Sequence, residues 1–219
     1  MVPEVIYLHY MNALLEGDKK QCFRIVDSLI EEKTCIKDIY IDLFQRSMYR
    51  IGQLWEKERC SVAREHIATK ITESLVEFTV SRLADKKETG KVVIITCINK
   101  EFHELGARMV AGLFEVHGWN SIFLGSNTPQ NELVELIRQR KPQIVGISNN
   151  FYINTCRLVK LIDLLKTEFP GLNIIVGGQS LADGRAACLC KFNDVRYINS
   201  LDELEEFLQN KFKVLKGSL

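Results

Sequence analysis

At 219 residues, the chain is long enough for one large domain or two small ones, and either would bury a proper core. Its 29 basic and 28 acidic residues nearly cancel, which excludes a global attraction to nucleic acid or to anionic membranes. The hydrophobic content of 46% is that of an ordinary soluble globular protein, and no apolar run approaches the length of a membrane span. The first residues lack the basic-then-apolar form of a signal peptide, so we expect a cytoplasmic protein.

The first part of the chain shows no strand-like alternation and predicts four helices. The first helix ends at Gly17, and Asp18 can cap the second. An apolar stripe at helical spacing, from Ile36 to Trp55, predicts the third helix, and Ser61 can cap the fourth. Because the connections are short, we expect an antiparallel four-helix bundle.

Strands and helices alternate in the second part of the chain. The predicted strands are Lys91–Thr96, Asn120–Leu124, Gln143–Ser148, Leu172–Val176 and Val195–Ile198. The predicted helices are Glu104–His117, Pro129–Arg140, Thr155–Phe169, Leu181–Cys190 and Leu201–Phe212. This alternation predicts a Rossmann-like α/β domain with a five-stranded parallel sheet in flavodoxin order, 2-1-3-4-5. We assign residues 1–85 to the bundle, 86–90 to a polar linker and 91–219 to the α/β domain.

Seven cysteines are scattered without CxxC spacing, and no zinc-ligand pattern appears. Cys188 and Cys190 are close in sequence but fall in a predicted helix, where residues two apart face different ways. We therefore expect reduced, buried thiols, as in cytoplasmic proteins.

A histidine follows the first predicted strand, in the segment Glu101–Gly106. In an open α/β sheet, ligands dock on the loops that leave the strands at the switch point, here the first and third strands. His103 would therefore face a crevice shared with the loop after Ser148, and Glu101 would be available to orient its ring. The chain has no GxGxxG or GxxxxGK[ST] motif, so an ordinary dinucleotide site and a phosphate-binding loop are disfavoured.

Three short motifs along this domain, called stations below, resemble the fingerprint of the cobalamin (vitamin B12)-binding domain family. That fingerprint reads Asp-x-His-x-x-Gly, then Ser-x-Leu or Ser-x-Thr, then Gly-Gly. Here they read Glu101-x-His103-x-x-Gly106, Ser148-Asn149-Asn150 and Gly177-Gly178. Two positions depart from the pattern: Glu101 stands in place of aspartate, and Asn150 in place of leucine or threonine. A helical bundle before such a domain is also the family arrangement.

The resemblance implies a role for each station. His103 would displace the cofactor's own benzimidazole and become the lower axial ligand of cobalt, and Glu101 would accept its other ring N–H. Gly106 begins the helix past which the displaced nucleotide tail would run. Ser148 would form a hydrogen bond with the buried benzimidazole, and Gly177 and Gly178 would leave room for the nucleotide tail. The implied cofactor is adenosylcobalamin or methylcobalamin.

A second pattern, Trp55 followed after nine residues by Glu65-His66, resembles the helical cap of cobalamin-dependent light sensors, a group of transcriptional regulators. By this resemblance the three residues cover the upper face of the cobalt, and the cofactor is held between cap and Rossmann-like domain. DNA-binding members carry a histidine directly after that tryptophan, where this chain has Glu56. No helix-turn-helix precedes the bundle, so we expect no direct binding to nucleic acid.

Simpler explanations exist for these residues. A lone histidine is more often structural than a ligand, so His103 depends on its neighbouring stations for support. Trp55 would also serve as a core aromatic, and His66 as a satisfied core histidine. His9 and His117 are expected to be surface or packing residues.

Three functions start from cobalamin binding. The first is a sensor that holds alkylcobalamin and passes a light or ligand signal to a partner protein. The second is a corrinoid methyl carrier that serves separate methyltransferases, and the third is a storage or delivery protein without chemistry of its own. Outside the cobalamin contacts the sequence shows no nucleophile–base pair, so enzyme status stays open, and an exposed bundle face would support a homo-oligomer.

Overall fold

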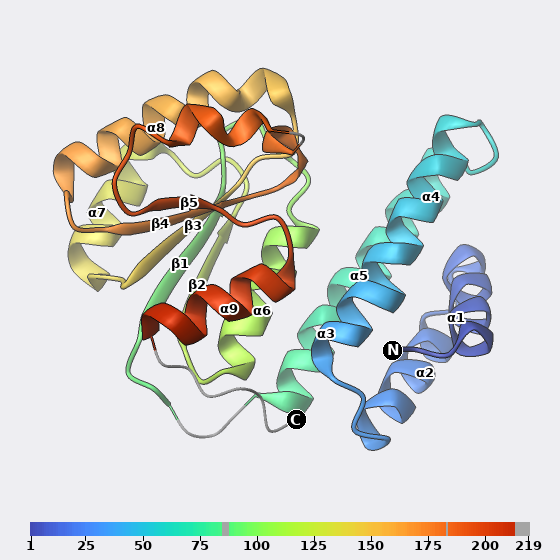
Figure 1. The fold of residues 1–219 in the computed structure, drawn as a ribbon. Coiled ribbons are helices and arrows are strands. Elements are labelled where there is room, and N and C mark those ends of the chain that lie inside the picture. Colours follow the sequence, from blue (N-terminus) through green and yellow to red (C-terminus); the bar gives the residue numbers. More distant parts are fainter. Residues whose placement is uncertain (85–87, 183, 213–219) are drawn as a thin grey trace. The chain divides into compact units, whose positions relative to one another are not determined.

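The computed structural model describes residues 1–84, 88–182 and 184–212. They form two compact units, a helical unit (1–84) and an α/β unit (88–212), drawn in Figure 1. The first residues of the predicted 86–90 linker lie outside the described residues. Among the helices that the structure describes, none is long and apolar enough to cross a membrane.

The helical unit contains the four predicted helical stretches. They are α1 (Glu4–Glu16), α2 (Lys19–Glu31), the continuous run α3 (Ile36–Asp38), η1 (Ile39–Gln45) and α4 (Arg46–Glu56), and α5 (Val62–Leu83). Gly17 ends α1 in the left-handed conformation at φ 73°, which glycine adopts without strain. The Asp18 carboxylate accepts the Gln21 backbone N–H at 2.9 Å, and the Ser61 hydroxyl accepts that of Arg64 at 3.3 Å. Both predicted caps are confirmed.

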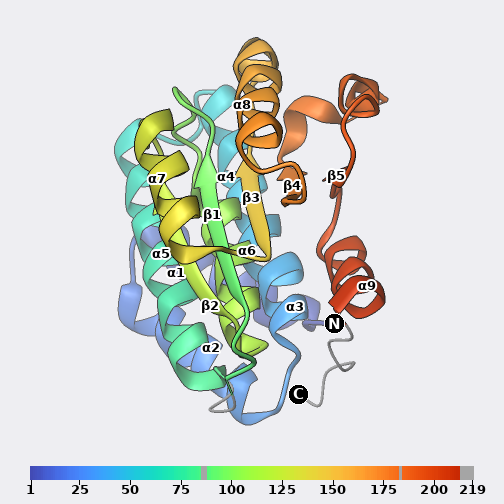
Figure 2. The same cartoon turned by 90° about the vertical axis from the view of Figure 1, so that its left-hand side faces the viewer.

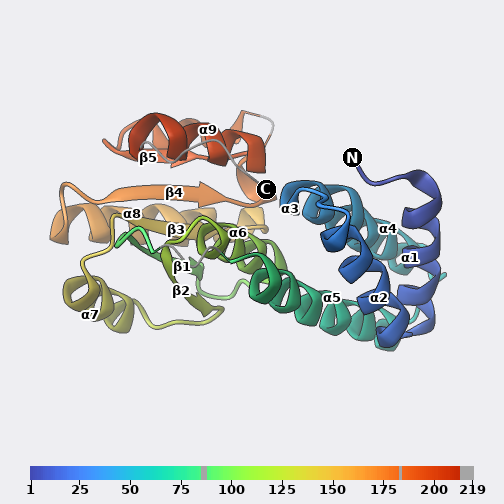
Figure 3. The ribbon, with the colours of Figure 1, turned by 90° about the horizontal axis from the view of Figure 1, so that it is seen from below.

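The third helix is not a plain α-helix, because η1 is π-helical. A π-helical turn holds an extra residue and so turns the side chains after it about the helix axis. Tyr40 and Phe44, within η1, are fully buried, whereas Trp55 on the last turn of α4 is 49% exposed. Figure 3 shows α3 leading into α4. Helix α5 packs against α1, α2 and α4, and so forms the centre of the bundle.

The α/β unit contains the five predicted strands, each within one residue of its predicted ends. The strands are β1 (Val92–Cys97), β2 (Asn120–Gly125), β3 (Ile144–Ser148), β4 (Asn173–Gly177) and β5 (Val195–Tyr197). The helices are α6 (Leu105–Val116), α7 (Gln130–Arg140), η2 (Tyr152–Asn154), α8 (Thr155–Glu168), η3 (Gln179–Leu181), η4 (Arg185–Leu189) and α9 (Leu201–Phe212). All strand pairs are parallel, in the order β2-β1-β3-β4-β5 that Figure 2 shows from one side to the other. The predicted fold class is therefore confirmed.

Helices cover both faces of the sheet. Leu133 and Ile137 of α7 and Leu158 and Ile162 of α8 belong to one buried cluster with strand residues such as Val145. On the other face, which α6 and α9 cover (Figure 1), Trp119 contacts Phe114 and Phe212 edge-on. Both faces therefore bury an apolar layer, as parallel sheets require.

The predicted helix Leu181–Cys190 is wrong. In its place lie the short 3₁₀ helices η3 and η4, and Gly184 between them adopts a left-handed conformation at φ 82° that a continuous α-helix does not allow. The expectation of buried thiols also needs correction, because Cys156 and Cys190 are exposed. Cys156 lies on the first turn of α8, and Cys190 follows η4 at the surface.

Candidate cofactor-binding site

Three loops begin side by side at the carboxyl edge of the sheet. Cys97 of β1 is the register partner of Ser148 of β3, which is in turn the partner of Gly177 of β4. The chain leaves all three strands at the same level, at the switch point between β1 and β3. This is the position at which open α/β sheets bind ligands.

The Glu101 carboxylate joins the first two of these loops. Its side chain is fully buried, Oε1 accepts the backbone N–H of His103 at 2.9 Å, and Oε2 accepts those of Asn150 at 2.8 Å and Phe151 at 3.2 Å. A buried carboxylate is costly unless it is hydrogen-bonded, and here backbone donors from both loops supply the bonds. The glutamate is thus a fixed part of the site.

The His103 ring rests on this carboxylate while remaining open to solvent. Its Nδ1 lies 3.1 Å from Glu101 Oε1, and 67% of the side chain is exposed. Phe151 contacts the ring edge-on, with the ring centroids 4.9 Å apart. When Nδ1–H donates to the carboxylate, the lone pair of the neutral imidazole is on Nε2, which suits a metal ligand.

Asn150 connects His103 to the third loop. Its Nδ2 donates to the His103 carbonyl at 3.1 Å, and its Oδ1 accepts the Gln179 backbone N–H at 3.3 Å. Sequence reasoning treated Asn150 only as a departure from the family fingerprint. The contacts depend on how the two loops approach each other, which no local pattern reveals.

The glycines of the three stations differ in what surrounds them. A Cβ added at Gly106 or Gly177 would meet no atom within 4 Å, so there is open space beside both. At Gly178, where φ is 95°, a Cβ would lie 2.3 Å from the carbonyl oxygen of Asn149. Gly178 is therefore required by the close approach of two backbones, whereas Gly106 and Gly177 leave room for another molecule.

Cys97 is a further buried group beside the site that sequence reasoning missed. Burial is the main cause that raises the pKa of its thiol to about 12; the carboxylates of Glu104 and Glu101 contribute to this rise, and a hydrogen bond with Ser148 opposes it. The thiol therefore stays protonated at neutral pH. In the sequence, the only indication that Cys97 lies beside the site is its position at the end of a predicted strand.

Apolar side chains on the two loops that hold His103 are exposed. Phe102 is 67% exposed and Ile153 is 80% exposed, and Phe151 and Tyr152 are also exposed. Arg185 lies over the Tyr152 ring, 5.5 Å from its centroid. Exposed apolar side chains on the loops beside a histidine suit a large, flat ligand better than a small ion.

The second predicted group lies at one end of the helical unit. Trp55 is on the last turn of α4, and Glu65 and His66 are on the first turn of α5. Glu65 Oε2 lies 2.6 Å from His66 Nδ1, and Glu65 Oε1 accepts the Thr69 hydroxyl at 2.9 Å. The His66 side chain is 71% exposed, so it is not a core histidine. Trp55 likewise is not a core aromatic.

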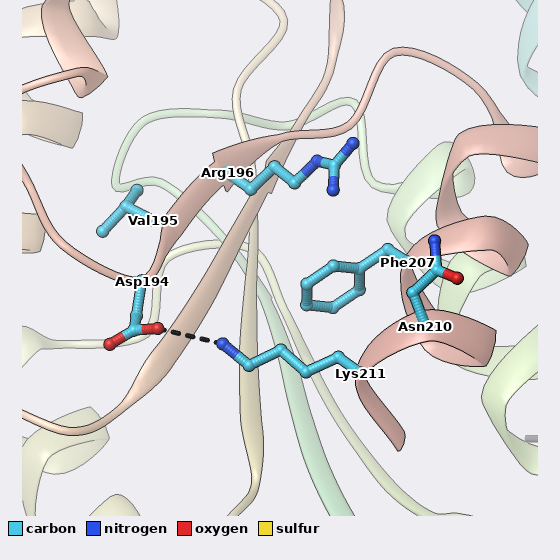
Figure 4. A pocket seen from close by; sticks show the side chains of 6 residues that line it. All are labelled: Asp194, Val195, Arg196, Phe207, Asn210 and Lys211. Carbon is cyan, nitrogen blue, oxygen red and sulfur yellow. Dashed lines mark hydrogen bonds and ion pairs between the residues drawn. The ribbon is translucent and has the colours of Figure 1, made fainter. Parts of the chain in front are cut away.

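Two surface hollows lie away from these residues. One, of about 460 Å³, lies between β5 and α9 and is shown in Figure 4. In it Lys211 pairs with Asp194 at 2.9 Å, a hydrogen bond that lowers the pKa of that carboxyl, and Arg196 pairs with Glu203. The other hollow, of about 670 Å³, lies between α7 and α8. Asp194 precedes β5, so the first hollow is at the amino ends of the strands, opposite to His103.

Both parts of the chain match protein-family models of a B12 binding domain. Residues 91–200 match one such model, and residues 9–78 match a second. Together the two matches include every predicted site residue.

Individual proteins give more distant matches. The chain is 24% identical over 140 residues to the HTH-type transcriptional repressor CarH of Myxococcus xanthus, covering 63% of this chain and 46% of that protein. It is 34% identical over 67 residues to the trimethylamine corrinoid protein of Methanosarcina barkeri, covering 31% and 30%. The chain thus spans less than half the length of either. The structure of the Methanosarcina barkeri monomethylamine corrinoid protein has the same fold, with a TM-score of 0.78 at 15% identity over 95% of this chain and 100% of that one.

Proposed function

The chain belongs to the B12-binding domain family, and from this premise we propose that it is a sensor that holds alkylcobalamin with His103 as the lower axial ligand. Its cofactor is cobalamin. When bound, the cobalt centre supplies a light-sensitive or transferable bond to its upper axial group. The observation that carries the proposal is the exposed His103 ring, whose Nδ1 is held by the buried Glu101 carboxylate.

The residues at the carboxyl edge fit this cofactor. An imidazole whose Nδ1 is hydrogen-bonded to a carboxylate presents Nε2 to a metal in one orientation. Here Glu101 is that carboxylate, and its negative charge raises the basicity of Nε2. The space beside Gly106 and Gly177 is open, as a nucleotide tail requires, and Ser148 stands between the loops that begin at Cys97 and Gly177. In the proposal, Gly178 lets the loops after β3 and β4 approach closely, so that they line the space for the nucleotide tail.

Residues of the helical unit support the sensor role. An exposed tryptophan is large enough to pack on a flat ring system, and the Glu65–His66 pair supplies polar groups nearby in sequence. We assign Trp55, Glu65 and His66 to the upper face of the cofactor. The similarity to CarH covers 46% of that protein. For this chain, we propose that the signal passes to a separate partner protein.

The second candidate is a methyl carrier that works with a separate methyltransferase. Its support is the likeness in sequence to the trimethylamine corrinoid protein, over a short segment. The two roles differ in what the upper face must do. A carrier has to offer the methyl group to another enzyme, whereas a sensor has to shield an alkyl group until a signal releases it.

Purified protein loaded in the dark with adenosylcobalamin or methylcobalamin separates the two roles. A sensor binds the adenosyl form more tightly, and green light changes both its absorption spectrum and its elution on size exclusion. A carrier shows no light-dependent change in assembly, and a corrinoid methyltransferase removes the methyl group from the bound cofactor. The second result would replace the sensor proposal with the carrier.

A further inference from the structure

The two positions at which this chain departs from the family fingerprint contact each other. Glu101 Oε2 accepts the backbone N–H of Asn150 at 2.8 Å, and Asn150 Nδ2 donates to the carbonyl of His103 at 3.1 Å. Neither leucine nor threonine has an amide that could donate in this way at position 150. The side chains at both departures therefore hold His103.

His103 is held by this pair at three of its polar groups. Its backbone N–H and its Nδ1 both meet Glu101 Oε1, at 2.9 and 3.1 Å, and its carbonyl accepts from Asn150. Phe151, whose backbone N–H also bonds Glu101, contacts the ring edge-on. Although the side chain of His103 is exposed, its position is fixed from the side of the loops.

The length of the glutamate is what allows both loops to be held. Oε1 accepts a backbone N–H from the loop after β1, and Oε2 accepts backbone N–H groups from the loop after β3. An aspartate is one carbon–carbon bond shorter, about 1.5 Å, so it would lose one of these two sets of contacts. The glutamate at 101 thus holds the backbone of both loops, while the side chain of Asn150 adds a bond to the carbonyl of His103.

Asn150 also reaches the loop after β4. Its Oδ1 accepts the backbone N–H of Gln179, the residue that follows Gly177-Gly178. One side chain therefore links the carbonyl of the proposed axial ligand to the loop beside which the nucleotide tail would run.

We propose that Asn150 is a positioning residue for His103 that acts together with Glu101. The pair sets the orientation of the imidazole before the cofactor arrives, and it couples ligation by His103 to insertion of the tail. Preorganisation of this kind raises affinity because less freedom is lost on binding. The inference rests on the proposed cobalamin function, but its first test does not need the cofactor.

The first experiment records the ¹⁵N shifts of the His103 ring in the protein without cofactor. We expect a single Nδ1–H tautomer in the natural sequence and a mixture of tautomers in Asn150→Leu. Asn131→Leu, an exposed asparagine on α7, is the matched control and should leave the His103 signals unchanged. If Asn150→Leu does not fold, Asn150→Asp removes the donor to the His103 carbonyl at almost the same size. Unchanged tautomer signals in a folded Asn150 variant would overturn the proposal.

The second experiment measures adenosylcobalamin affinity and the absorption spectrum of the bound form. Loss of the two side-chain hydrogen bonds of Asn150 should weaken binding by about thirtyfold in Asn150→Leu and leave part of the bound cofactor without histidine ligation. Since both side chains hold the same residue, His103, Glu101→Asp together with Asn150→Leu should cost less than the product of the two single effects. A double variant whose loss equals that product contradicts the coupling. Failure of the natural sequence to bind cobalamin would instead contradict the proposed function, while the tautomer result stands by itself.

Discussion

The carboxyl edge of the α/β unit and the α4–α5 end of the helical unit hold their site residues in different ways. At the edge, Glu101 is fully buried and bonds backbone N–H groups of two loops, so His103 is fixed by its surroundings. At the helical end, Trp55 is half-exposed and the Glu65–His66 pair lies at the surface. The difference is that contacts within the α/β unit alone hold His103 in place, whereas Trp55 and His66 have no such enclosure among the described residues of the helical unit.

The largest effect is expected from Glu101→Ala, which removes the acceptor of three backbone N–H groups. Groups left without partners at a buried position should destabilise the α/β unit by about 3 kcal/mol. Urea unfolding measures this loss. Glu135→Ala, at an exposed ion pair with Arg138, is the control and should change stability by less than about 0.5 kcal/mol. Equal effects of the two variants would mean that the carboxyl edge is not preorganised by Glu101.

Gly177→Leu should block the site without harming the fold. A Cβ added at Gly177 would meet no atom within 4 Å, so the unfolding midpoint should stay close to that of the natural sequence. If that space receives the nucleotide tail, cobalamin affinity should fall by about a hundredfold, or about 2.7 kcal/mol. Gly171→Leu places the same side chain in open space before β4 and should leave affinity unchanged. Unchanged affinity in Gly177→Leu would contradict the proposal that the nucleotide tail occupies the space beside Gly177.

Trp55→Ala tests the helical side of the comparison. Because the indole is half-exposed, its removal should cost about 1 kcal/mol of stability or less. Under the sensor proposal, affinity for adenosylcobalamin should fall by about tenfold more than affinity for methylcobalamin, measured by absorption titration. Tyr49→Ala, also exposed on α4, is the matched control. Equal losses for both cofactors would favour the carrier.

The smallest effect concerns thiol reactivity. Because burial raises the pKa of Cys97 to about 12, almost no thiolate is present at pH 8, and reactivity should rise only as the pH approaches 12. Cys156 and Cys190 are exposed and should be alkylated first. Peptide mass spectrometry after a short treatment with iodoacetamide measures the order. Early labelling of Cys97 would show that the carboxyl edge opens more readily than its contacts indicate.

The sequence was a good guide where the signal was local. Strand ends, helix caps at Asp18 and Ser61, and the strand order all follow from apolar periodicity and capping chemistry. The positions of Glu101 and His103 at a strand end followed from the same pattern.

Features that depend on contacts between distant segments were missed. The link from Asn150 to His103 joins residues 47 apart, and the apolar spacing of the third helix does not distinguish the π-helical segment η1 from an α-helix. The break at Gly184 was missed because an apolar, alanine-rich segment resembles a helix in composition. Exposure was also misjudged at Cys156 and Cys190, since the apolar character of a thiol does not fix its burial.

The central claim is that His103 ligates the cobalt of bound cobalamin, and the absorption spectrum tests it most directly. Titration of the dark protein with adenosylcobalamin should produce the base-off, histidine-on spectrum. His103→Ala should abolish that spectrum, while His9→Ala, an exposed histidine of α1, should retain it. A histidine-on spectrum that persists in His103→Ala, or no spectral change with the natural sequence, would contradict the account.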